Sequence, residues 1–241
     1  MPPRSLTDSP AVPLILASAS PARLTTLRAA GVWPTVVVST VDEDAAVAEA
    51  TTRYGELEAV DVALLLARAK AEDVAGGPGG SDGSGAGSLV LGCDSVLELD
   101  GEVHGKPADN DEARERWRRM RGRTGVLHTG HWLVDDREDG GGATLGASAS
   151  TTVHFAMLTD EEIDAYVETG EPLLVAGAFT VDGLGGAFVS AIEGDHHNVV
   201  GLSLPLLREL LGEIGVGWFD VVGGADHAED AATPVRDRGR R

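Results

Sequence analysis

The sequence predicts an α/β protein in which helices flank a central, twisted, mixed β-sheet. Short apolar segments typical of buried strands alternate with segments of helical periodicity, which indicates parallel strands joined by helices. Two long strand-like segments, Val126 to Val134 and Leu145 to Phe155, are joined only by the polar loop 137–142, so we expect them to pair antiparallel. The predicted sheet is therefore mixed.

The composition favours a soluble, acidic protein. Hydrophobic residues make up 42% of the 241-residue chain, and a net charge of -20 argues against nucleic acid as a partner. A single cysteine, Cys93, cannot form an internal disulfide. The first apolar run is too short for a signal peptide or a membrane span. We expect a cytoplasmic protein that contacts neither nucleic acid nor membrane.

One domain is expected over residues 13–220. It would lie between a disordered leader, 1–12, and a disordered tail, 221–241. The glycine-rich segment 75–88 has no side chains able to form a core, so we interpret it as a flexible loop within the domain.

The first strand, Leu14 to Ala17, runs into a serine-rich turn that includes Ser18. Ser20 is the expected N-cap of a helix that ends near Gly31. Backbone N–H groups at such a helix start face an anion, and Arg23 in the first turn is favourable only if an anion is present. The alternative, that Ser20 only caps the helix and Arg23 is solvated, remains open.

A second strand, Thr35 to Ser39, leads into the acidic turn 41–44, which contains Glu43. Most such turns are solvated loops. A helix is predicted over 56–74, where Lys70 borders the apolar face, whose expected members are Leu57, Val60, Leu64, Ala67 and Val74.

The segment 89–107 combines a carboxylate and a lysine. Its first apolar run ends near Asp94, a second strand follows over 96–99, and the dipeptide Asp100-Gly101 predicts a type I′ turn before Lys106. Lys106 and Lys70 are the only lysines among 19 basic residues. A lysine offers a compact charge suited to a phosphate oxygen, although two surface lysines could also persist by chance.

The remaining elements are read mainly as structural. The helix 109–121 carries five arginines that we expect to be solvated, and Thr159 begins a capping box. A glycine-punctuated strand pair is expected over 177–189, a polar turn over 192–200 and a final helix over 202–211. The adjacent His196 and His197 would point apart, so we interpret them as surface histidines rather than a metal pair.

The candidate site residues together suit a phosphoanhydride. Anion-binding groups come from Ser18, Ser20, Arg23, Lys70 and Lys106. Glu43 and Asp94 supply carboxylates, which can hold a divalent cation and accept a proton from water. No Walker loop, nucleophile elbow or Asp-x-Asp strand end offers a competing mechanism.

In these residues the chain resembles the Maf-type nucleoside triphosphate pyrophosphatases, which share the inosine-triphosphatase-like (Maf/Ham1) architecture. The resemblance spans roughly 14–211, and seven motifs carry it in order: LASASPAR at 16–23, VDE at 41–43, AKA at 69–71, GCDS at 92–95, GKP at 105–107, AGAF at 176–179 and NVVGL at 198–202.

The resemblance implies a reaction and roles for the site residues. Asp94 would be the catalytic proton acceptor, Glu43 and Asp94 would hold Mg²⁺ or Mn²⁺, and the serine, arginine and lysine positions would bind the triphosphate. A nucleoside triphosphate would be cleaved to its monophosphate and pyrophosphate by a homodimeric enzyme of the nucleotide diphosphatase type. Removal of non-preferred or modified nucleotides is the expected role.

Three positions depart from the pattern of members specific for dTTP and UTP. Ala22, Ser95 and Asp182 stand where those members carry arginine, threonine and glutamine. A carboxylate at Asp182 accepts hydrogen bonds where glutamine both donates and accepts, so the base remains open. A second hypothesis also remains: a nucleotide-binding regulator of septum formation that needs no turnover.

Overall fold

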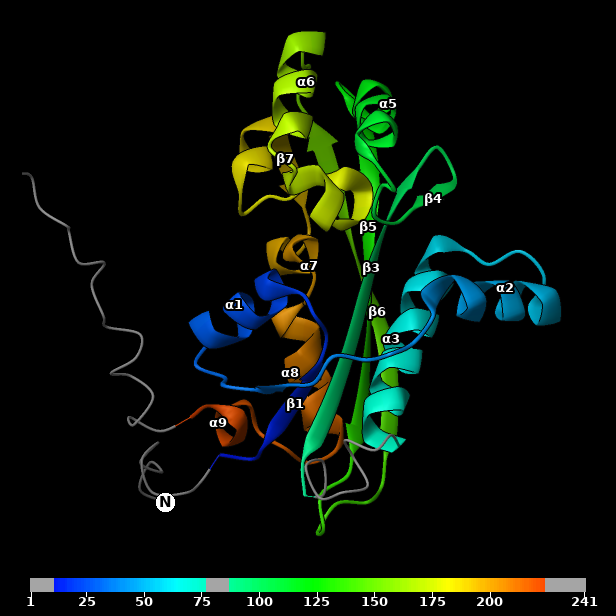
Figure 1. The fold of residues 1–241 in the computed structure, drawn as a ribbon. Helices are drawn as coiled ribbons and strands as arrows, with labels where there is room; N and C mark the ends of the chain where they lie inside the picture. Colours follow the sequence, from blue (N-terminus) through cyan, green and yellow to red (C-terminus); the bar gives the residue numbers. More distant parts are fainter. Residues whose placement is uncertain (1–10, 77–86, 224–241) are drawn as a thin grey trace, which may run out of the picture.

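The fold is built on one mixed β-sheet (Figure 1). The computed structural model describes residues 11–76 and 87–223. Within these residues the sheet has seven strands in the order β2-β1-β3-β5-β6-β7, with β4 added to β3. The strands are β1 Leu14–Ala17, β2 Thr35–Val36, β3 Leu89–Leu99, β4 Glu102–His104, β5 Thr124–Asp135, β6 Thr144–Phe155 and β7 Val189–Glu193. β1 is parallel to both of its neighbours and the other pairs are antiparallel, which confirms the predicted mixed sheet.

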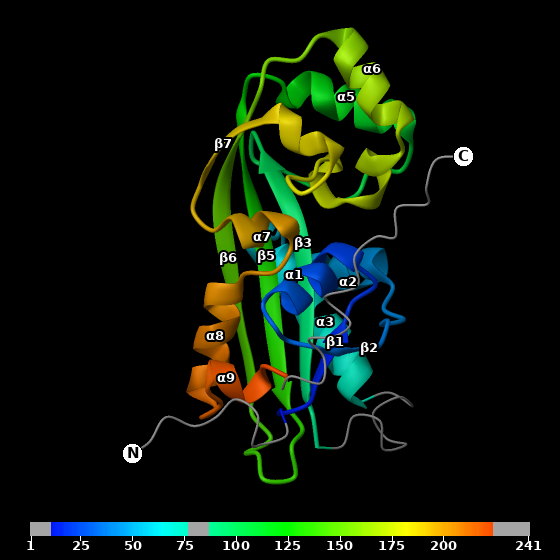
Figure 2. The ribbon, with the colours of Figure 1, turned by 90° about the vertical axis from the view of Figure 1, so that its left-hand side faces the viewer.

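Helices cover both faces of this sheet. They are α1 Pro21–Ala29, α2 Glu43–Tyr54, α3 Ala59–Gly76, α5 Asn110–Met120, α6 Asp160–Glu168, α7 His196–Val200, α8 Leu204–Glu213 and α9 Trp218–Val221. Short 3₁₀ turns, η1 Glu171–Leu174, η2 Ala176–Ala178 and η3 Leu184–Phe188, lie beside α6. In Figures 1 and 2, α3 lies along one face of β3 and β5, and α1, α7 and α8 lie on the other. No helix among the described residues is long and apolar enough to cross a membrane.

Helix α3 approaches the sheet closely because both surfaces carry minimal side chains. A Cβ atom added to Gly92 would lie 2.2 Å from the Ala67 carbonyl oxygen, and one added to Gly130 would lie 2.3 Å from that of Ala63. Glycine on the strands and alanine on the helix therefore bring α3 against β3 and β5. This close approach carries Lys70 to the sheet.

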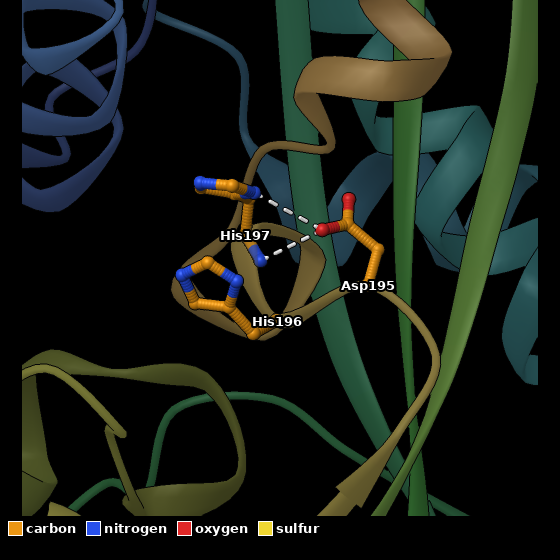
Figure 3. A group of neighbouring side chains, drawn as sticks. All are labelled: Asp195, His196 and His197. Carbon is orange, nitrogen blue, oxygen red and sulfur yellow. Dashed lines mark hydrogen bonds and ion pairs between the residues drawn. The ribbon is translucent and has the colours of Figure 1, made fainter.

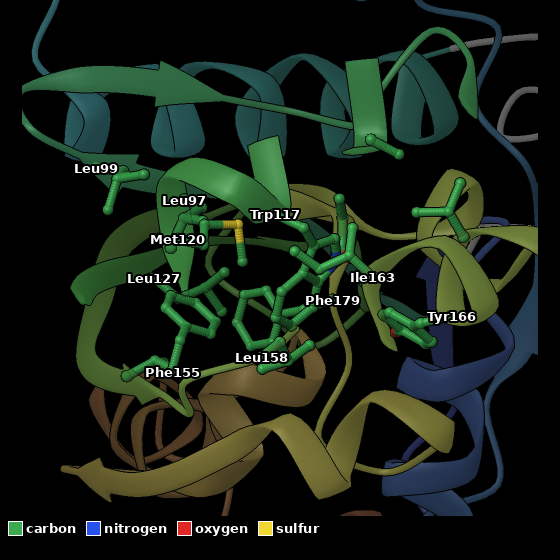
Figure 4. Packing of buried hydrophobic residues seen from close by; sticks show 14 of the residues in the cluster. Leu97, Leu99, Trp117, Met120, Leu127, Phe155, Leu158, Ile163, Tyr166 and Phe179 are labelled. Carbon is green, nitrogen blue, oxygen red and sulfur yellow. The ribbon is translucent and has the colours of Figure 1, made fainter. Parts of the chain in front are cut away.

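Two large apolar clusters hold the sheet at its two ends. One surrounds Trp117, whose ring packs edge-on against Phe155 and Tyr166 (Figure 4). The partly buried Phe188 packs edge-on against the same ring. The Trp117 indole nitrogen also donates to the Ala178 carbonyl oxygen at 2.8 Å. The other cluster is aliphatic and joins β1 and β3 to α1 and α8. The polar residues of the candidate site lie between these two clusters.

Several predicted elements are confirmed. Ser20 caps α1, Asp109 caps α5, and Thr159 with Glu162 forms the capping box of α6. Asp100 and Gly101 have φ values of 57° and 78°, as a type I′ turn requires. The arginines of α5 pair with carboxylates of the same or neighbouring elements, and only Arg116 among them is buried.

Other predictions were wrong. The run through Asp94 does not end there: β3 is one continuous strand of 11 residues. The acidic turn is the start of a helix, because Asp42 accepts the Ala45 N–H and caps α2. The expected apolar face of α3 is displaced, since Val60 and Leu64 are only partly buried. The face packed on the sheet comprises Ala59, Val62, Ala63, Leu66, Ala67, Ala71 and Val74.

The expected strand pair over 177–189 is also wrong. Gly177 and Ala178 adopt positive φ values of 70° and 63°, and the segment forms η2 and η3 up to Phe188. The predicted second strand is reduced to Thr35–Val36, and the polar turn near 196 contains α7. The leader, the glycine-rich loop and the tail fall largely on 1–10, 77–86 and 224–241, which lie outside the described residues.

Candidate active site

The candidate site lies where one edge of β3 has no strand beside it. β1 pairs with β3 up to Gly92, and β4 begins its pairing at Leu97. On its other edge β3 pairs continuously with β5. Residues 93–96 therefore border an interruption in the sheet, the kind of position where α/β proteins bind ligands.

On the α3 face of this edge, three charged side chains form a chain of ion pairs. The Lys70 ammonium nitrogen lies 2.5 Å from Asp94 Oδ1 and 2.7 Å from Glu43 Oε1. The Asp94 side chain is 10% exposed and that of Glu43 is 52% exposed, so the chain leads from the interior to solvent. Three candidate site residues that are distant in sequence, on α2, α3 and β3, thus lie in contact.

Burial makes the ionised form of Asp94 less favourable. Burial raises its pKa above the ordinary value of 3.8, although the Lys70 and Arg23 charges oppose this effect. A carboxyl group with a raised pKa accepts a proton more readily near neutral pH. The neighbouring Cys93 is fully buried, and burial raises its pKa to about 12, so it stays a protonated thiol.

On the opposite face of β3, Arg23 forms hydrogen bonds to a second group of site residues. Its Nη1 donates to Ser18 Oγ and its Nη2 to Ser95 Oγ, both at 3.0 Å, and its Nε donates to the Gly201 carbonyl oxygen at 2.7 Å. These bonds use three of the five guanidinium N–H groups and leave two for a ligand. Arg23 is buried, so the alternative of a solvated arginine is excluded.

The serine turn is ordered around these contacts. Ser20 Oγ caps α1 by accepting the Arg23 N–H at 3.5 Å, and the Ser20 N–H donates to Ser18 Oγ at 3.2 Å. These bonds hold the Ser18 and Ser20 hydroxyl groups at the start of α1, a position where proteins commonly bind anions.

The other predicted site residues are less closely held. Lys106 is exposed two residues beyond the last pair of β4, His104 with Leu97, and it forms no hydrogen bond or ion pair within the described part of the chain. Ala22 lies on α1 beside Arg23. Asp182 lies between η2 and η3, where its carboxylate accepts the Thr180 hydroxyl. These residues are not in contact with the Lys70 chain.

Polar supports behind the site were missed by sequence reasoning. Thr129 Oγ1 lies 2.9 Å from Ser95 Oγ and donates to the Asn198 carbonyl oxygen at 3.1 Å. Asn198 Nδ2 in turn donates to Leu127 O, Ala149 O and Thr151 Oγ1, which ties α7 to β5 and β6. Asn198 stands in one of the motifs that carry the resemblance, but its linking role depends on cross-strand distances that a sequence does not contain.

A support for Glu43 was also missed. Asp73 on α3 accepts the Thr40 N–H at 2.8 Å and the Ser39 hydroxyl at 2.9 Å. The Thr40 N–H lowers the Asp73 pKa and keeps the carboxylate charged. This anchor fixes the loop that leads into α2 and thus the helix start that carries Glu43.

Known proteins match this chain over nearly all of its described domain. A family model described as "Maf-like protein" matches residues 13–214. The chain belongs to the Maf-like protein family. A relative from Leifsonia xyli subsp. xyli, named nucleoside triphosphate pyrophosphatase, is 53% identical over 86% of this chain and 95% of its own. One of the same name from Salinispora tropica is 57% identical over 84% of each chain.

A solved structure of a HAM1 protein from Coxiella burnetii aligns with this Maf-like chain at a TM-score of 0.40 and 16% identity. It covers 84% of this chain and 99% of that chain, a likeness too low to bear on the assignment.

Proposed function

We propose that this Maf-like protein is a nucleoside triphosphate pyrophosphatase, a hydrolase that converts a nucleoside triphosphate and water into the monophosphate and pyrophosphate. The observation that carries the proposal is the buried Asp94, paired with Lys70 next to the Arg23 and Ser18 turn. An anion site alone would only bind a nucleotide. A carboxylate of raised pKa beside it supplies a proton acceptor for water.

The cationic side chains of the site would neutralise the negative charge of the phosphates. Arg23 offers its two remaining N–H groups, and Ser18 and Ser20, whose oxygens accept Arg23 N–H groups, add their hydroxyl hydrogens as donors at the start of α1. Lys70 shields the developing charge beside Asp94, and Lys106, which is exposed and has no partner among the described residues, would contact the phosphates of a bound nucleotide.

Asp94 is the base in this scheme. It takes one proton from the attacking water while the bond between the α phosphate and the bridging oxygen breaks, and pyrophosphate leaves with the bridging oxygen. Lys70, 2.5 Å from Asp94, keeps the carboxylate charged until the proton arrives.

The donor set fits a hard divalent cation. Glu43 and Asp94 both direct a carboxylate oxygen at one point, which the Lys70 ammonium now shares. Mg²⁺ is typically held by one or two carboxylates together with substrate phosphates. Glu43 and Asp94 would hold Mg²⁺ or Mn²⁺, and the bound ion would neutralise phosphate charge.

The substrate base is set by other residues. Ala22, Ser95 and Asp182 differ from the pyrimidine-specific pattern, and we assign the protein to non-preferred or modified nucleotides in the cytoplasm. Ser95 is already engaged by Arg23 and Thr129, so its influence would act through the position of that guanidinium. A homodimer is the expected assembly, and light scattering of the purified protein would measure it.

The proposal is tested by the products. The purified protein would be incubated with a panel of ordinary and methylated nucleoside triphosphates in the presence of Mg²⁺ or Mn²⁺, and pyrophosphate and orthophosphate would be quantified separately. We expect pyrophosphate and the monophosphate in equal amounts. Release of orthophosphate would contradict the proposed cleavage position, and no release from any nucleotide would favour a binding protein.

A further inference from the structure

A second polar cluster lies at the start of α7 (Figure 3), on the face of the sheet opposite α3. It comprises Asp195, His196 and His197, and one ligand-type atom from each lies within 4.8 Å of the others. The two imidazole rings do not point apart, as the sequence suggested: their centroids are 3.9 Å apart at an interplanar angle of 43°. Both rings project from the same side of the helix start.

Unlike His128, His131 and His154, the two histidines retain free ring nitrogens, and unlike the largely buried His104 they lie side by side near the surface. His128 uses both nitrogens, on Glu98 and Ser150, and His154 uses both, on Glu193 and Thr124. His131 likewise contacts the Thr129 carbonyl oxygen and accepts the Ser203 N–H.

In the α7 cluster, His197 uses only Nδ1, which lies 3.1 Å from Asp195 Oδ1. His196 forms no hydrogen bond within the described residues, and its side chain is exposed. Free imidazole nitrogens are thus held close together at the surface.

The Asp195 carboxylate orients the His197 ring and selects its tautomer. It accepts the His197 backbone N–H at 3.0 Å as the N-cap of α7 and faces the ring Nδ1. A carboxylate in this position favours the tautomer with hydrogen on Nδ1 and leaves Nε2 as a lone-pair donor. Histidines that bind metal ions are commonly oriented in this way by a carboxylate.

We infer that His196 and His197 form a binding site for a borderline divalent ion such as Zn²⁺ or Co²⁺, with Asp195 as the orienting carboxylate. Two imidazole nitrogens favour such ions over Mg²⁺, which prefers oxygen ligands. The site does not depend on the proposed pyrophosphatase reaction. It is distinct from the carboxylates Glu43 and Asp94, which suit a hard ion.

The histidine cluster lies close to Arg23, which would hold a bound nucleotide. α7 ends at Val200, and the carbonyl oxygen of its C-cap Gly201 accepts the Arg23 Nε–H at 2.7 Å. The five residues of α7 span about 7 Å, so an ion bound at its start would lie within reach of a nucleotide held by Arg23. Water or a phosphate oxygen would complete the coordination.

Co²⁺ binding tests the site directly, because a Co²⁺ ion with nitrogen ligands has a visible d–d spectrum. The chelator-treated full-length protein would be titrated with Co²⁺, followed by displacement with Zn²⁺, without any nucleotide. We expect a d–d band that Zn²⁺ removes and that excess Mg²⁺ leaves unchanged. His196→Ala and His197→Ala should each weaken Co²⁺ binding by about tenfold or more, and Asp195→Asn by about 10- to 100-fold.

His154→Ala is the matched control, because His154 is a partly exposed histidine paired with a carboxylate outside the cluster. It should bind Co²⁺ like the wild type. The inference is overturned if His196→Ala and His197→Ala retain wild-type affinity, or if His154→Ala weakens binding as much as they do, which would indicate adventitious binding to surface histidines. Because His196 is exposed, His196→Ala keeps the test valid even if the other variants unfold.

Discussion

The Lys70 ammonium nitrogen lies 2.5 Å from Asp94 Oδ1, so the candidate base is held in a nearly buried ion pair. Burial raises the Asp94 pKa and Lys70 lowers it, with burial the larger effect. Burial therefore sets the direction of the Asp94 pKa shift, and the Lys70 charge limits its size.

Replacing Lys70 with methionine should lower kcat/KM by about 100-fold or more, because the site loses a charge that stabilises the transition state. The acid limb of the pH–rate profile should also move to higher pH, since the Asp94 pKa loses its main lowering influence. Arg68→Met is the matched control, because Arg68 lies on the same helix and pairs with Glu72 in solvent. An unchanged acid limb in Lys70→Met would contradict the assignment of Asp94 as the base.

Gly92→Ala should destabilise the protein and separate Lys70 from Asp94. The added Cβ would lie 2.2 Å from the Ala67 carbonyl oxygen and 2.8 Å from the Ala71 nitrogen, so α3 must move. We expect the free energy of unfolding in urea to fall by about 2–3 kcal/mol. Gly141→Ala, where nothing lies within 4 Å of the added atom, should be nearly neutral. Equal stability of the two variants would show that α3 does not need this close approach.

Asp73→Ala should impair activity without removing any group that contacts substrate. Loss of the hydrogen bonds from Thr40 and Ser39 frees the loop before Glu43, and kcat/KM should fall about tenfold, equivalent to about 1.4 kcal/mol. Asp73→Asn keeps an acceptor oxygen and should recover most of the rate. Glu72→Ala, at the preceding position, is the control and should keep the wild-type rate. Failure of asparagine to restore the rate would argue against a positioning role.

His131 should make stability depend on pH. Burial is the main cause that lowers its pKa from 6.5 to about 4, and its Nε2 accepts the Ser203 N–H as a neutral imidazole. Because the unfolded chain binds this proton more tightly, the contribution is complete above about pH 6.5 and is lost as pH falls toward about 4. That loss amounts to about 3 kcal/mol. Urea unfolding of His131→Gln across this range should show a smaller pH slope than the wild type and His154→Gln, and equal slopes would refute the assignment.

Local chemistry made two turns near the site predictable. The serine cap before Pro21 and the Asp100-Gly101 turn depend on neighbouring residues, and the structure contains both. The contact between Lys70 and Asp94 depended on the resemblance, because no spacing rule brings residues 24 positions apart into contact.

The errors have physical causes. α2 lacks a strong apolar face and has only Ala50 buried, so its periodicity gave little signal. In α3, Ala63, Ala67 and Ala71 rather than Leu64 and Leu65 face the sheet, because the glycines of β3 and β5 admit only small partners. Between η2 and η3 the chain is held by side chains such as Glu171, which accepts the Leu184 and Gly185 N–H groups. Such tertiary contacts leave no periodic pattern.

The most direct test of the account is to measure turnover and nucleotide binding in Asp94→Asn. Asparagine keeps the size of the side chain but cannot accept the proton from water, so pyrophosphate release should fall by about 100- to 10,000-fold. Calorimetry should still detect binding of a nonhydrolysable nucleoside triphosphate analogue. Glu98→Gln, on the same strand and face and paired with His128, should retain the wild-type rate. Release of pyrophosphate by Asp94→Asn at the wild-type rate would contradict the account.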